Sequence, residues 1–118
     1  MKLKNKTLET LLPVYAKLVN AEYEDYLVAI EITKDGFKVE DAFKVFTKLK
    51  NALFSKYKNE EGNIEQSKVV LFNEEFDKLH NTEQEVKITR KIPKSVLNSV
   101  KMTGMGAKTL YDCKLIED

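Results

Sequence analysis

The sequence has few of the residues that mark a metal site, a disulfide-bonded protein or a membrane segment. Among its 118 residues are one cysteine, one histidine and no tryptophan. Cys113 alone cannot form an internal disulfide, and with His80 alone it cannot complete a Cys/His zinc site. No apolar run approaches the roughly 20 residues of a membrane-spanning helix, and the opening MKLKNKTLETLLPVY lacks the apolar stretch of a signal peptide. We therefore expect a soluble, cytoplasmic protein that contacts no membrane.

Neither sign of charge is in excess. Lys and Arg together number 20 and Asp and Glu 19, which gives a net charge of +1. Such a chain has no overall field with which to hold a polyanion or an acidic membrane. With 42% hydrophobic and 33% charged residues, the composition fits one globular domain, residues 1–118, with a hydrophobic core.

Apolar residues recur at helical spacing at the start of the chain and in its middle. The first pattern predicts a helix over 7–20, capped by Asn5 or Thr7. Pro13 lies inside it, so the helix either begins near Leu12 or is kinked at the proline. A second stripe, followed by a polar turn at 59–63, predicts a helix that ends near Tyr57. That stripe consists of Ala42, Phe43, Phe46, Leu49, Leu53 and Tyr57.

The segment before this stripe supports two structures. Asp35-Gly36 stands between Ile32 and Phe37, which is typical of a tight β-hairpin. The apolar residues from Tyr23 to Phe37 also fit helical spacing, and one internal glycine costs only about 1 kcal/mol relative to alanine. The residues alone do not decide between helix and hairpin.

The last part of the chain changes its pattern twice. Val69, Phe72, Phe76 and Leu79 predict a helix from Ile64 to His80, with a capping box of Asn63 and Gln66. Residues 85–92 alternate polar and apolar, which predicts a strand with Val86, Ile88 and Ile92 facing the core. Pro93 ends that strand. We expect one or two helical turns over 95–100 and a last short element over 108–116.

No group of residues forms a convincing catalytic site. The stretch from Gly104 to Thr109 resembles the end of a phosphate-binding loop, but Ala107 separates Gly106 from Lys108 and the first glycine of the motif is missing. His80 is expected to stabilise the end of a helix, and Cys113 to be an inert buried thiol. We therefore predict no enzymatic activity, no catalytic residue, no cofactor and no metal.

Two surfaces are candidates for binding. A basic segment, residues 87–94, contains Lys87, Arg90, Lys91 and Lys94 and could contact nucleic acid, although no aromatic residue is interleaved to stack bases. The aromatic residues crowd into one third of the chain, more than one helical stripe can bury. We expect an exposed subset to bind a partner protein or a second copy of the chain. These candidate partner-binding residues are Tyr23, Tyr26, Phe43, Phe54 and Tyr57.

The order of several segments resembles a family of small phage and prophage proteins of Gram-positive bacteria, the domain of unknown function 1617 family. The segments are the opening MKLKNKTLETLLPVYAKL, the helical middle that ends in LFSKYKNEEGN, the passage FNEEFDKLHNTEQEVKI and the closing AKTLYDCKLIED, which together touch about two thirds of the chain. The resemblance implies a phage origin and one long helix over Tyr23 to Tyr57. It transfers no active site, and the chain departs from the pattern at Asp35-Gly36 and at 103–106.

Taken together, the patterns predict a mainly helical α+β fold. A long helical hairpin packs on an N-terminal helix, and a small antiparallel β element lies in the C-terminal third. The expected function is that of a non-enzymatic phage accessory protein that binds a host protein, such as a defence component, in the host cytoplasm. One alternative is a virion or tail assembly component that forms homo-oligomers. The other is a nucleic-acid-binding protein that uses residues 87–94.

Overall fold

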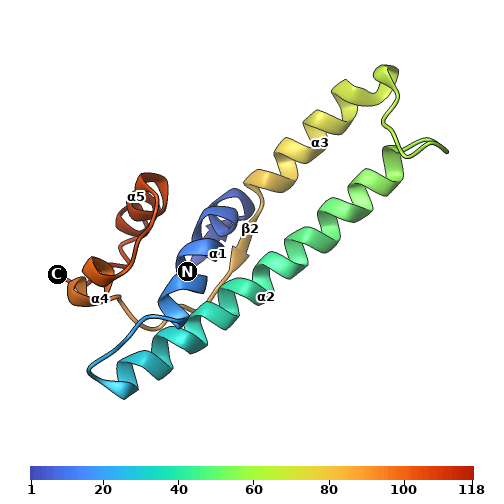
Figure 1. Cartoon of the computed structure of the whole chain (residues 1–118). Coiled ribbons are helices and arrows are strands. Elements are labelled where there is room, and N and C mark those ends of the chain that lie inside the picture. The colour runs from blue at the N-terminus through green and yellow to red at the C-terminus, as the bar shows by residue number, and fades with distance from the viewer.

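The chain folds into five α-helices and one short two-stranded sheet (Figure 1). The computed structural model describes residues 1–118. In chain order the elements are β1 (Lys2–Lys4), α1 (Asn5–Val19), α2 (Tyr26–Tyr57), the 3-10 turn η1 (Gln66–Lys68), α3 (Val69–Asn81), β2 (Glu83–Glu85), α4 (Lys94–Ser99) and α5 (Gly104–Asp112). The predicted mainly helical α+β fold, with a long helical hairpin on an N-terminal helix, is confirmed. None of the helices combines the length and apolar character needed to cross a membrane.

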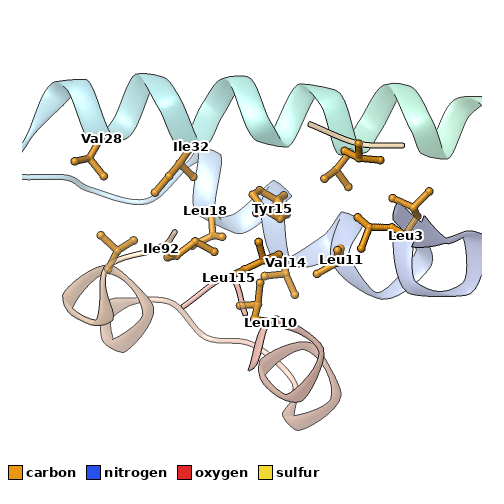
Figure 2. Close-up of a cluster of buried hydrophobic side chains, with 14 residues drawn as sticks. Leu3, Leu11, Val14, Tyr15, Leu18, Val28, Ile32, Ile92, Leu110 and Leu115 are labelled. Atoms are coloured by element: carbon orange, nitrogen blue, oxygen red, sulfur yellow. The ribbon is translucent and has the colours of Figure 1, made fainter. Parts of the chain in front are cut away.

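The core is built around α1, which lies between α2 on one side and α4 and α5 on the other (Figure 2). Leu8, Leu11, Tyr15 and Leu18 of α1 recur every three or four residues, so all four point inward and are fully buried. The residues that meet them come from distant parts of the chain. They are Leu3, Val28, Ile32, Val39, Val86, Ile92, Val96, Leu110 and Leu115.

The start of α1 differs from the sequence prediction. The helix begins at Asn5 and runs through Pro13, which excludes a start near Leu12. No side chain caps it, because Asn5 is buried and used elsewhere. The Asn5 amide nitrogen donates to the Leu79 carbonyl at 2.8 Å, and its oxygen accepts from Gln84 at 2.7 Å. Asn5 therefore joins the start of α1 to the end of α3 and to β2.

Residues 26–57 form one helix, which excludes the hairpin. The family resemblance also implies a long helix here. Asp25 caps α2 by accepting the Leu27 N–H at 2.9 Å. Gly36 is buried where α1 and α2 approach closely, since a Cβ atom there would lie 3.0 Å from Cγ2 of Val19. The glycine that suggested a turn is therefore a helix-packing residue.

Asp35 is fully buried and holds the segment that follows β2. Its carboxylate accepts the backbone N–H groups of Thr89, at 3.1 Å, and Arg90, at 2.9 Å. It also accepts the Thr89 hydroxyl at 3.1 Å, and the Lys38 ammonium lies 3.6 Å away. Because a buried carboxylate is stable only when it is hydrogen-bonded, Asp35 ties α2 to residues 89–90.

The strand predicted over 85–92 is mostly wrong. β2 ends at Glu85 and pairs with β1 in antiparallel register, Leu3 opposite Gln84. The predicted burial holds for Val86 and Ile92, whereas Ile88 is half-buried. Val86 still pairs with Met1, but residues 87–91 have no neighbouring strand, and the Asp35 carboxylate accepts two of their N–H groups instead. Ile92 forms one isolated parallel bridge, to Ile116 near the C-terminus.

Other helix boundaries also shift. The helix predicted from Ile64 begins as η1 at Gln66 and as α3 at Val69, and no side chain caps either. The predicted capping box is absent, because the Asn59 side chain accepts from the Glu61 and Asn63 N–H groups. The last element, predicted over 108–116, is α5 and begins at Gly104.

Candidate protein-binding surface

The second half of α2 and the whole of α3 form an antiparallel hairpin that projects beyond the core (Figure 1). We call residues 45–81 the arm. Phe46, at its base, is the last fully buried residue of α2, and no residue of α3 is buried. The molecule measures 55 × 24 × 21 Å as a result. The arm is thus two helices thick and open to solvent on both sides.

Aromatic rings fill the seam between the two helices of the arm. The Phe72 ring lies at the centre, with centroids 6.4 Å from Phe54, 6.0 Å from Tyr57 and 5.7 Å from Phe76. The contacts with Phe54 and Tyr57 are edge-to-face, a favoured geometry for aromatic pairs. These rings therefore hold α3 on α2.

The base of the seam is tied to the core through His80. Its ring lies 4.4 Å from Phe76 and 5.4 Å from Phe46 between centroids, and its Nε2 is 3.0 Å from the Glu9 carboxylate of α1. His80 lies at the end of a helix, as predicted, but its ring nitrogen contacts Glu9. This contact joins the base of α3 to α1.

Three apolar side chains of the arm lie on one side of it and are about half exposed. They are Val45 (49%), Leu49 (47%) and Leu71 (54%). The Lys56–Glu75 ion pair, at 3.0 Å, joins α2 to α3 and so marks one side of the arm to which both helices contribute. Helical spacing puts Leu49 two turns before Lys56, Val45 one turn before Leu49, and Leu71 one turn before Glu75. We call this surface, with Ala52 included, the arm face.

The two helices of the arm carry opposite charge. Residues 44–58 of α2 and its C-cap contain five lysines and no carboxylate, whereas α3 contains Glu74, Glu75 and Asp77 against Lys78. The hydrogen bond between Lys56 and Glu75 lowers the pKa of the Glu75 carboxyl and raises the pKa of the Lys56 ammonium. Both groups are therefore charged at neutral pH, and they put one positive and one negative charge side by side on the arm face.

The structure does not bring the five predicted partner-binding residues together. Tyr26 and Tyr57 are the first and last residues of α2, which puts them about 46 Å apart at 1.5 Å per residue. Phe54 and Tyr57 do meet, on either side of Phe72.

The other members of the predicted set have different environments. Tyr26 is 73% exposed, close to the α1–α2 loop. Tyr23 is half-buried, and its hydroxyl donates to the Leu18 carbonyl at 2.6 Å. Phe43 packs against the core and edge-on to Phe46, with centroids 5.9 Å apart. Tyr23 and Phe43 therefore have structural contacts of their own.

Sequence reasoning missed the arm face. Leu49 belongs to the apolar stripe that predicts this helix, yet it is half exposed because α3 covers only the neighbouring side of α2. One signal for α3 was present: Val69, Val70 and Leu71 are consecutive, and three consecutive helical residues cannot all face inward. In the structure all three are exposed.

The basic segment 87–94 is partly engaged in contacts within the chain. Arg90 lies 3.5 Å from the Glu31 carboxylate, and the Lys87 carbonyl accepts from Lys38. Lys91 and Lys94 line a hollow of about 530 Å³ together with Lys114 and the exposed Tyr111. Three carboxylates share the hollow, Asp112, Glu117 and Asp118, so its lining carries balanced charge.

The residues considered for catalysis lie in separate environments. No hydrogen bond joins His80 to Cys113, and burial followed by the charge of Asp112 raises the pKa of the Cys113 thiol. Lys108 pairs with Asp112 at 2.6 Å within α5. No group of three or more His, Cys, Asp or Glu side chains is arranged to hold a metal ion.

Comparisons with protein-family models, with curated proteins and with solved structures found no match to this chain. The resemblance to the phage family therefore stays a prediction.

Proposed function

We propose that this protein is a non-enzymatic binding protein that acts by occupying a surface of another protein through its arm. The family resemblance suggests a phage accessory role, in which the target is a host factor such as a defence component. The arm is the part of the molecule that supports this proposal best. It is the place where half-exposed apolar side chains of two helices lie beside an ion pair that joins those helices.

The amount of exposed surface carries the argument. The chain exposes 7979 Å², whereas a compact monomer of 13.6 kDa exposes about 6,600 Å². Its radius of gyration is 17.0 Å, against about 13.5 Å for a compact domain of this length. The excess surface, about 1,400 Å², exceeds the roughly 800 Å² that each partner contributes to a standard protein interface.

The excess belongs mainly to the arm. A helix normally buries one face, but α3 has no buried residue and α2 has none beyond Phe46. Covering the arm face would remove Val45, Leu49 and Leu71 from water, and each fully buried apolar side chain contributes about 1.5–3 kcal/mol. A partner that covers this face therefore gains affinity without any change in the core.

A capture experiment tests the proposal. Tagged chain is expressed in the bacterial host, and bound proteins are identified by mass spectrometry and then purified to measure the dissociation constant. We expect a protein that binds the wild type and the Tyr111→Lys variant, which changes an exposed residue of α5, but not the double variant Leu49→Lys, Leu71→Lys. A partner whose affinity ignores the arm substitutions would refute the role of the arm.

An assembly role is the second candidate. The Lys56–Glu75 pair favours it, because a surface that presents one charge of each sign side by side can bind a copy of itself. Genes for head or tail proteins on both sides would support assembly.

A further inference from the structure

We infer that the arm face binds a second copy of this chain, with α2 of each copy against α3 of the other around a twofold axis that runs along the arm. This inference rests on the proposed function, because it names the partner of the same surface. The product is a four-helix bundle in which every neighbouring pair of helices is antiparallel, the usual arrangement of such bundles. The two cores lie at the same end of the bundle.

The charge pattern is the first argument for a copy as the partner. A twofold axis along the arm keeps each residue at its own height, so Lys56 of one copy is level with Glu75 of the other. Within one chain these two groups already lie 3.0 Å apart. The paired arms therefore bring together two lysines and two glutamates in alternation, so that each charge has an opposite charge on the other copy. The opposite arrangement, α2 on α2, would put Lys56 of one copy against Lys56 of the other.

The position of the apolar residues is the second argument. Leu49 lies about two helical turns from Lys56 toward the base of the arm, on the arm face. The same axis puts the Leu49 side chains of the two copies at one height, where they face each other, with Val45 and Ala52 on either side. Leu71 lies on the other side of the Lys56–Glu75 layer, toward the tip, so pairing the arms removes apolar side chains from water on both sides of that layer.

The surface area fits a twofold dimer. An isologous interface of standard size buries about 800 Å² on each copy. The chain exposes about 1,400 Å² more than a compact monomer of its mass. One such interface would therefore account for more than half of the excess.

Sedimentation equilibrium over a range of concentrations tests the inference. We expect the wild type to approach twice 13.6 kDa as its concentration rises. Leu49→Lys should raise the dissociation constant of the dimer at least roughly tenfold, since it buries a charge at the centre of the interface. Val70→Lys is the matched control. Val70 is 66% exposed, and helical spacing puts it on the side of α3 opposite Phe72, so the substitution should leave the mass unchanged. A monomer at every concentration, or equal effects of the two substitutions, overturns the inference.

A charge swap tests the orientation of the two copies. The double variant Lys56→Glu, Glu75→Lys keeps opposite charges at both positions within the chain. It should therefore form its own dimer as the wild type does. In a mixed dimer, Lys56 of the wild type would be level with the lysine at position 75 of the swapped chain. Wild type and swapped chain should therefore sort into separate dimers when mixed. Native mass spectrometry of chains with tags of different size would show this. Free mixing refutes the pairing of α2 with α3.

The two proposals fail in different ways. A monomeric chain whose arm still binds another protein keeps the proposed function and overturns the dimer. A dimer that resists Leu49→Lys uses another surface, which also overturns the inference. A dimer that depends on the arm, with no further protein bound through it, supports the inference and leaves assembly as the function.

Discussion

Replacing Asp35 by alanine tests directly what holds the segment after β2 in place. The variant removes a fully buried carboxylate and leaves the N–H groups of Thr89 and Arg90 and the Thr89 hydroxyl without their acceptor. Hydrogen bonds to charged groups contribute about 1.5–3 kcal/mol each, and breaking a buried charged network costs about 3–5 kcal/mol. Alanine inside α2 restores about 0.7 kcal/mol of helix propensity. We expect the free energy of unfolding to fall by about 3 kcal/mol.

Two measurements check this value. Urea denaturation should give the 3 kcal/mol loss, and the melting temperature should fall by roughly 12 °C for a chain of this length. Hydrogen exchange should accelerate at the Thr89 and Arg90 amides before the rest of the core opens. Asp41→Ala is the control, because Asp41 is exposed on the same helix and gains the same propensity. Equal stabilities of the two variants would refute the structural role of Asp35.

Three further substitutions separate other contributions. Tyr15→Phe removes a buried hydroxyl that has no hydrogen-bond partner, so stability should rise by about 1 kcal/mol in urea denaturation. Burial raises the pKa of the Tyr15 hydroxyl, so the folded state loses stability as the pH rises above about 10. The Tyr15→Phe variant should therefore unfold at a higher pH than the wild type when followed by circular dichroism. An unchanged alkaline transition would contradict this. Gly106→Ala places a Cβ atom 2.8 Å from Cγ2 of Val14 and should cost about 1–2 kcal/mol by thermal melting, whereas Gly104→Ala, with open space around it, should cost nothing. Phe72→Ala should lower stability by about 2 kcal/mol and accelerate hydrogen exchange in α3 but not in α1; uniform acceleration would show that the arm and the core unfold together.

Long helices with one apolar stripe could be predicted from the sequence because their burial depends on local periodicity. The stripe of Leu8, Leu11, Tyr15 and Leu18 is the core-facing side of α1, as its spacing indicates. Local patterns fail where a distant segment decides the structure. Asp35 followed by glycine resembles a turn, but Thr89, far along the chain, uses the carboxylate.

The strand and the arm face failed for a related reason. Alternation correctly indicated that Val86 and Ile92 are buried, but a strand also needs a neighbour, and β1 is only three residues long. For Leu49, periodicity identifies an apolar stripe without showing how much of it the next helix covers. Phe54 and Tyr57 were assigned to a binding surface from composition, and in the structure they pack on Phe72. Whether they also bind a partner stays a prediction.

The position of α1 between early and late elements has a consequence for synthesis on the ribosome. α2 follows α1 directly and can cover one side of it as soon as both have emerged. The opposite side, which includes Val14, is covered by Leu110 and Leu115 from the end of the chain (Figure 2). Until residues 110–115 have left the ribosome, that side stays exposed to chaperones and to other nascent chains. A chain cut before Leu110 would therefore leave this side of the central helix uncovered and direct the product to aggregation or proteolysis.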